Sequence, residues 1–281
     1  MANPHFAKLG DVWKHLPLVE ALRREPPAAY CETHAGAAWY PLTPSPERRY
    51  GIYAFLERAP GVPALASSRY LHRLRRLPTD AGAPQRYPGS ATLAMMELGR
   101  GAEYVLADTD AASVDDLRGA AAALGLADRA RCVEGDGMPS VQAFCEAHAS
   151  PASVLVHVDP FDPHGVSRAG GVSAIELAAR LAERSVRVAY WYGLDHEDHS
   201  GWAWRELGGA APGWSGELAF PARFVYAGRD GMWGCGVVLL NLAGATCEAI
   251  AAQGRALAGA LRGLPEPGEP PVRFAERGRG A

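Results

Sequence analysis

The chain has 281 residues and a net charge of −3, with 48% hydrophobic and 21% charged residues. These fractions exclude a mainly disordered chain, because such chains are poor in apolar residues and rich in charge. The negative net charge excludes a whole-molecule basic field for nucleic acid, although a local basic face can still exist. No apolar run reaches the length of a membrane span, and residues 1–25 lack the apolar segment of a signal peptide. We therefore expect a cytoplasmic protein with no membrane partner.

Short apolar runs alternate with amphipathic stretches along the chain. The apolar runs predict strands at 28–36, 103–110, 130–137, 153–161, 186–193, 217–227 and 235–241. Apolar residues at helical spacing predict helices at 12–25, 50–59, 67–77, 113–125, 171–184 and 246–263.

Strands that alternate with helices are typical of an α/β fold, a mostly parallel sheet with helices on both faces. We expect seven strands, the last two forming an antiparallel pair, in a single domain over residues 1–281. Residues 41–88 exceed what a simple strand–helix–strand crossover needs and predict an inserted helical subdomain. The Pro- and charge-rich residues 264–281 predict a loose tail. We expect a monomer.

Acidic residues and glycines follow four of the predicted strands. Since ligands bind at the carboxyl ends of the strands in such sheets, these residues form one candidate site. Its members are Glu32, His34 and Gly36 after the first strand, Asp108 and Asp110 after the second, Asp136 and Gly137 after the third, and Asp159, Pro160, Phe161 and Asp162 after the fourth.

The residues at each strand end can be interpreted either as ligand-binding or as purely structural. The turn at Gly36 lets the backbone approach a ligand closely, or it is only a tight turn. Asp108 is placed to accept both hydroxyls of a ribose, whereas Asp110 suits a helix N-cap. Asp136 suits a contact to an adenine amine, with a turn as the alternative.

The segment at Asp159 carries the candidate chemistry. A carboxylate followed by Pro160 and Phe161 can accept the N–H bonds of an amine while the aromatic ring stacks on a base, so that the rate comes from positioning. Asp162 and His164 could instead bind a metal together with Asp159. A third interpretation is that these acids belong to a loop and cap the next helix. The acid- and His-rich Leu194–His199 fits a solvated loop better than a metal site.

The inserted segment contains the most basic patch of the chain. Arg69, Arg73 and Arg76 recur at helical spacing and could track a phosphate backbone, or they form a solvated helix face. The five Cys form no C-x-x-C pair and are typical of buried thiols.

In chain order the sequence contains GDVWKH, ETHAGAAWY, RYPGSATLA, GDG, HVDPFDP, YWY and GCGVVLLN, between Gly10 and Asn241. These segments resemble motifs of the RlmJ family of 23S ribosomal RNA adenine-N6 methyltransferases, class I enzymes with an inserted helical subdomain. The resemblance implies a Rossmann-like sheet, S-adenosylmethionine as cofactor and Asp159 as the catalytic carboxylate. It also implies a methyl-donor site lined by His15, His34, Ser90, Asp108, Asp136 and Gly137.

The expected activity is therefore methylation of an exocyclic adenine amine, with RNA favoured over DNA. Phe161 and Asp162 stand where the family has Pro and Tyr. With the acidic net charge, this keeps a small-molecule acceptor as an alternative. A protein that binds the cofactor without catalysis is a second alternative. A metal-dependent hydrolase is a third, although we expect no metal.

Overall fold

The computed structural model describes residues 6–80, 83–167, 171–225 and 232–278. Among these residues, the central element is an eight-stranded sheet with the strand order β12-β10-β11-β9-β8-β1-β6-β7. Its strands, in chain order, are β1 (Ala29–Glu32), β6 (Glu103–Asp108), β7 (Ala130–Glu134), β8 (Val154–Val158), β9 (Arg187–Leu194), β10 (Gly213–Ala219), β11 (Gly234–Leu240) and β12 (Arg273–Gly278).

The sheet changes its direction of growth beside β1. From β1 the order runs outward through β6 and β7, whereas β8 and β9 lie on the other side of β1, and all these neighbours pair in parallel. The contact between β1 and β8 is therefore a topological switch point, where ligands of such sheets bind at the carboxyl ends. β11 pairs antiparallel with both β9 and β10.

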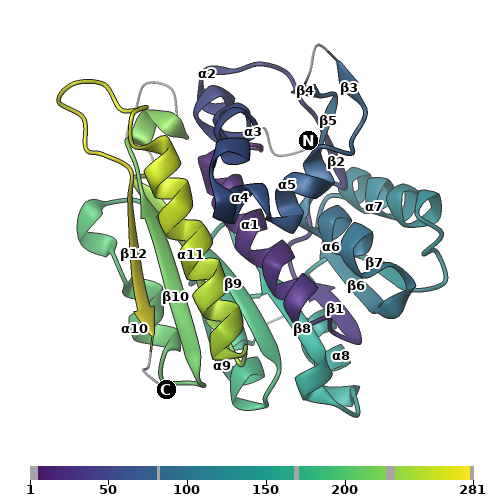
Figure 1. Ribbon diagram of the computed structural model, residues 1–281. Helices are drawn as coiled ribbons and strands as arrows, with labels where there is room; N and C mark the ends of the chain where they lie inside the picture. Colours follow the sequence, from purple (N-terminus) through teal and green to yellow (C-terminus); the bar gives the residue numbers. More distant parts are fainter. Residues whose placement is uncertain (1–5, 81–82, 168–170, 226–231, 279–281) are drawn as a thin grey trace.

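Helices cover both faces of the sheet (Figure 1). One face carries α1 (Leu9–Arg24), α6 (Ser90–Leu98), α7 (Ala111–Ala123) and α11 (Gly244–Leu261), over one apolar core. The other face carries α8 (Gly137–Ala147), α9 (Ala174–Glu183) and α10 (Trp202–Leu207), over a second core.

The central strands are apolar because both of their faces are covered. All residues of β1 and β8 are buried, and their sequences AYCE and VLVHV include a carboxylic acid, Glu32, and an imidazole, His157. Strands in the middle of a parallel sheet normally read as continuous apolar runs. These two polar side chains lie next to each other at the switch point, with His157 Nδ1 3.6 Å from Glu32 Oε1.

The inserted segment is closed by a small antiparallel pair, in which β2 (Trp39–Pro41) lies against β5 (Arg86–Pro88). Its buried residues Phe55, Tyr70 and Leu74 belong to the same core as α1 and α11. The segment therefore has no core of its own. It contains α2 (Pro46–Arg48), η1 (Arg49–Tyr53), α3 (Ala54–Arg58), η2 (Ala59–Gly61), α4 (Pro63–Ala66), α5 (Arg69–Leu74), β3 (Thr79–Asp80) and β4 (Ala83–Pro84).

The eighth strand corrects the expectation of a loose C-terminal tail. Residues 273–278 form β12, which pairs antiparallel with β10. Phe274 packs edge-on against Trp13, with ring centroids 5.3 Å apart, and Arg277 donates to the buried carboxylate of Glu217. These long-range contacts hold a charge-rich strand whose own sequence is weakly apolar.

The expected α/β, Rossmann-like fold class is confirmed, with one strand more than predicted. The helices α6, α8 and α10 were not among the predicted elements, and short 3₁₀ turns complete the chain: η3 (Gly99–Gly101), η4 (Pro151–Ser153), η5 (Glu197–His199) and η6 (Ala222–Phe224). The predicted strand at 217–227 begins at Gly213 and ends at Ala219, and its last two residues lie outside the described residues. Among the described residues, no helix has both the length and the apolarity that a membrane crossing requires.

Candidate functional site

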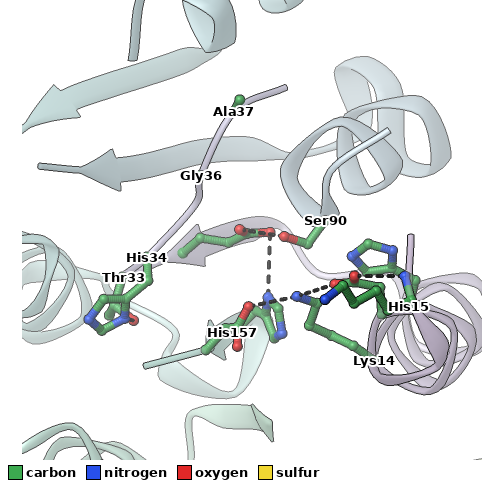
Figure 2. Close-up of polar contacts among 12 residues, drawn as sticks. Lys14, His15, Thr33, His34, Gly36, Ala37, Ser90 and His157 are labelled. Atoms are coloured by element: carbon green, nitrogen blue, oxygen red, sulfur yellow. Dashed lines mark hydrogen bonds and ion pairs between the residues drawn. The ribbon is translucent and has the colours of Figure 1, made fainter. Parts of the chain in front are cut away.

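Residues from β1, β6, β7 and β8 meet at the carboxyl edge of the sheet, beside the switch point. Figure 2 shows Ser90 from α6, Lys14 from α1 and His157 from β8 pointing toward this region, below the turn that carries Gly36. Parallel pairing of these strands brings the predicted strand-end residues Gly36, Asp108, Asp136 and Asp159 to one edge of the sheet.

The turn after β1 has a backbone conformation that requires glycine and is fixed by two hydrogen bonds. Gly36 has φ +62°, a conformation in which a side chain is strained, and a Cβ there would lie 2.5 Å from the Tyr40 hydroxyl oxygen. Its N–H donates to Asp108 Oδ2 at 2.8 Å, and the N–H of Ala37 donates to the Tyr40 hydroxyl at 3.0 Å. The turn is therefore fixed from β6 and from its own C-terminal side.

Asp108, at the end of β6, accepts two backbone hydrogen bonds. Besides holding Gly36, its Oδ1 accepts from the N–H of Asp110 at 2.9 Å. Each carboxylate oxygen can accept about two hydrogen bonds, so one site on each oxygen remains for ligand hydroxyls. Asp110 accepts from the N–H of Ser113 at 3.0 Å and caps α7, which confirms the N-cap prediction.

Asp136 and Gly137 join β7 to α8. Asp136 Oδ1 accepts from the N–H of Met138 at 3.1 Å, and Oδ2 accepts from the hydroxyl of Ser167. A Cβ on Gly137 would lie 2.2 Å from the carbonyl oxygen of Thr33. Glycine is thus required here because the start of α8 lies directly against the turn after β1.

His34 lies among the acids of the strand ends. Burial lowers the pKa of His34, although Asp159, Asp108 and Asp136 act in the opposite direction. The Thr33 hydroxyl lies 2.8 Å from its Nδ1. At neutral pH the ring is therefore uncharged and can donate or accept one hydrogen bond toward a ligand.

Asp159 forms an ion pair with Lys14 at the end of β8. Lys14 Nζ lies 2.8 Å from Asp159 Oδ2 and 2.9 Å from Asp11 Oδ1. Burial works to raise the pKa of Asp159, but the positive charge of Lys14 and the nearby His157 hold it below its usual value. Burial likewise opposes the charge on Lys14, yet Asp11 and Asp159 raise its pKa. Both groups are therefore charged at neutral pH.

Glu32 is completely buried beneath this ion pair. Its Oε2 accepts from the Ser90 hydroxyl at 2.9 Å, and Oε1 accepts from the Tyr30 hydroxyl. His157 Nδ1 lies 3.6 Å from Oε1. Ser90 therefore acts on the site through Glu32, and it positions the start of α6 against β1.

His15 is buried between α1 and the inserted segment. It is 2% exposed, and its Nδ1 is 2.7 Å from the hydroxyl of Tyr87, which lies 2.8 Å from that of Tyr70. Burial lowers the pKa of His15 strongly, and the charges of Lys14 and His157 act in the same direction. His15 thus ties α1 to the inserted segment.

The residues after Asp159 differ sharply in exposure. Pro160 is buried, whereas Phe161 is 100% exposed. Asp162 Oδ1 accepts from the N–H of His164 at 3.0 Å, so Asp162 shapes the turn. Phe161 is thus free to meet a partner beside the candidate carboxylate.

The three arginines of the inserted segment have unequal surroundings. Arg69 and Arg73 both pair with Glu97 on α6, at 3.0 Å and 2.7 Å. Arg76 is exposed. Two of the three guanidinium groups therefore already form ion pairs with Glu97. The helical spacing of the arginines could not predict this partner.

The hypothesis of a metal site is not supported by the residues that the structure describes. No group of three or more His, Cys, Asp or Glu side chains among the described residues could hold a metal ion. The Leu194–His199 loop instead precedes Ser200 and Gly201, which both donate to the buried Glu217.

Sequence reasoning missed Lys14 and His157 as site residues. Lys14 carried a signal, because it is one of two lysines in a chain whose other 26 basic residues are Arg. His157 carried another, since it interrupts the apolar run of a central strand. Neither signal named a partner.

Comparisons with known proteins identify the fold. No protein-family model and no curated protein matches the sequence. A Legionella pneumophila protein described under the family DUF519 superposes with a TM-score of 0.73 at 18% identity, over 98% of both chains. The O-methyltransferase from Bacillus cereus, in complex with S-adenosylhomocysteine, gives a TM-score of 0.42 at 11% identity over 85% of this chain and 84% of its own. Streptomyces achromogenes TomG, an O-methyltransferase in complex with S-adenosylmethionine, gives 0.40 at 11% over 79% and 77%.

Proposed function

We propose that the protein is an S-adenosylmethionine-dependent N-methyltransferase whose acceptor amine is received by Asp159. One observation carries the proposal. The Gly36 turn, Asp108, Asp136 and Asp159 come from four different strand ends and converge around His34 at the switch point.

The residues fit the chemistry of the cofactor. The backbone at Gly36 can be approached closely, because it has no Cβ. Asp108 keeps acceptor capacity for ribose hydroxyls, and we assign the adenine amine to Asp136. The bound cofactor would supply an electrophilic methyl group on a sulfonium sulfur.

Asp159 would act by orientation. Its Oδ2 is held by Lys14, so Oδ1 is the oxygen that accepts an N–H of the acceptor amine. This leaves the nitrogen lone pair free to face the methyl group, and the fixed geometry lowers the barrier. The ion pair keeps Asp159 unprotonated and therefore ready to accept.

The favoured acceptor is the exocyclic amine of adenine in RNA. Asp159–Pro160 and the exposed Phe161 support this choice, because an exposed aromatic ring beside the carboxylate can stack on a base. A small-molecule acceptor is the second candidate. The engagement of Arg69 and Arg73 by Glu97 favours it, since it removes two contacts that phosphates would use.

Calorimetric titration with S-adenosylmethionine and S-adenosylhomocysteine tests the cofactor site. We expect saturable binding of both, abolished by Asp108→Ala. Asp115→Ala is the matched control, because Asp115 is an exposed acid on α7 whose carboxylate pairs only with Arg118 among the described residues. If neither cofactor binds the wild-type protein, the proposed function is wrong.

Transfer of a labelled methyl group then identifies the acceptor. Total RNA and free adenine nucleosides are each incubated with the protein and labelled S-adenosylmethionine. Label in N6-methyladenosine of RNA supports the favoured acceptor. Label only in a small molecule assigns the second candidate, and no label in either with intact cofactor binding contradicts both.

A further inference from the structure

A buried histidine faces a buried glutamate at the switch point. In the pairing of β1 with β8, His157 stands directly opposite Glu32. His157 is 2% exposed and Glu32 is 0% exposed. The His157 Nδ1 has no hydrogen-bond partner among the described residues, and it lies 3.6 Å from Glu32 Oε1. A buried ring nitrogen without a partner is rare enough to need an explanation.

Glu32 needs the donors that surround it. An ionised carboxylate in the interior is costly unless hydrogen bonds and opposite charge compensate it. Ser90 and Tyr30 each donate one hydrogen bond to Glu32. A proton on His157 Nδ1 would face the remaining side of Oε1. With that proton, donors from α6, β1 and β8 would surround the Glu32 carboxylate.

The same imidazole also lies beside the candidate catalytic centre. His157, the last but one residue of β8, precedes Asp159 by two residues. Figure 2 shows His157 beside Lys14, whose ammonium pairs with Asp159. The ionisable neighbours of His157 are Glu32 from β1, Lys14 and His15 from α1, His34 from the turn after β1, and Asp159 just after β8.

We propose that His157 is a positioning residue of the methyl-transfer site: it carries a proton on Nδ1, donates it toward Glu32, and so holds the cofactor turn after β1 and Asp159 after β8 at a fixed separation. The inference rests on the proposed function and adds a residue to it. His157 touches neither cofactor nor acceptor in this role. It acts through Glu32 on one side and through the end of β8 on the other.

The tautomer of His157 in the ligand-free protein gives the first test. Long-range ¹⁵N–¹H correlation spectra, with resonances assigned along the backbone, show which ring nitrogen carries the proton. We expect a protonated Nδ1, alone or with a protonated Nε2. A ring protonated only on Nε2 overturns the inference. This test requires no cofactor, so it stands even if the proposed function fails.

Three substitutions at His157 give the second test. Asn places an amide donor near the position of Nδ1, Gln places one near Nε2, and Leu has none. We expect His157→Leu and His157→Gln to weaken S-adenosylhomocysteine binding about tenfold, as the loss of one hydrogen bond to a charged group would. His157→Asn should restore most of the affinity.

Folding and cofactor affinity must be separated in this series. His148→Leu, the same change at the end of α8, is the matched control and should bind as the wild-type protein does. If His157→Leu does not fold, His157→Leu combined with Glu32→Gln removes both members of the pair and should recover stability. Equal affinity in all His157 variants, or no difference between Asn and Gln, contradicts the positioning role.

Discussion

Lys14 Nζ lies 2.8 Å from Asp159 Oδ2, so an ion pair joins α1 to the end of β8. The same ammonium is 5.3 Å from the centroid of the Trp191 ring. Both side chains of the pair are mostly buried, with 13% and 20% exposure. A buried pair fixes geometry because either charge alone would be costly there. The candidate carboxylate is therefore held by a helix that precedes it by more than a hundred residues.

Asp159→Asn should remove most methyl transfer and leave the cofactor bound. An amide oxygen accepts a hydrogen bond from an amine more weakly than a carboxylate does, and the proposed mechanism uses this bond to orient the acceptor. We expect turnover to fall at least about 100-fold, with the Kd for S-adenosylhomocysteine changed less than about twofold. Single-turnover transfer and calorimetry measure the two quantities. Unchanged turnover would remove Asp159 from the mechanism.

The Lys14–Asp159 pair should make stability depend on pH in the acid range. The folded protein holds the pKa of Asp159 below the isolated value of 3.8, so its stabilising effect is present above that value and is lost as pH falls through the folded pKa. The free energy of unfolding should therefore differ most between wild-type protein and Asp159→Asn above pH 3.8, and the difference should shrink below it. Urea denaturation across pH measures this. A constant difference would show that the carboxylate charge does not matter.

Gly137→Ala should destabilise the junction of β7, α8 and the turn after β1. The new Cβ would meet the Thr33 carbonyl oxygen at 2.2 Å and Ala107 Cβ at 2.8 Å. Overpacking of this kind costs about 1–3 kcal/mol, and a displaced turn should also weaken cofactor binding. Gly119→Ala on α7 is the control, since nothing lies within 4 Å of its Cβ. It should stabilise the helix by about 1 kcal/mol. Equal effects of the two substitutions in denaturant unfolding would contradict the assignment.

The arginines of the inserted segment should separate by role. Arg73→Ala removes a half-buried partner of Glu97 and should cost about 1 kcal/mol of stability. Arg76→Ala should leave stability unchanged. If RNA binds, Arg76→Ala should lower the slope of log affinity against log salt by about 1. Denaturation and RNA titration at several salt concentrations test both statements. A larger effect of Arg73 than of Arg76 on the salt slope would reverse the roles.

The positions of the central strands and the residue types at their ends were largely predictable from local sequence, whereas the order of the strands in the sheet came from the structure. Apolar runs ending in Asp or Gly located β1, β6, β7 and β8, because a central parallel strand is apolar throughout and its loop is polar. The N-cap at Asp110 was equally local, since an acid before a helix accepts an N–H within three residues. Helix α8 was missed, although Asp136 marks its start in the same way.

Only the tertiary structure decided which charges meet. The sequence determined the α/β class, the insertion as a candidate and the acids at the strand ends, because these follow from periodicity over neighbouring residues. It could not pair Lys14 with Asp159, His157 with Glu32, or Arg73 with Glu97, nor place β12 on the sheet edge. Those partners lie far apart in the chain, and the free energy that joins them arises from burial and strand register, which exist only in the folded molecule.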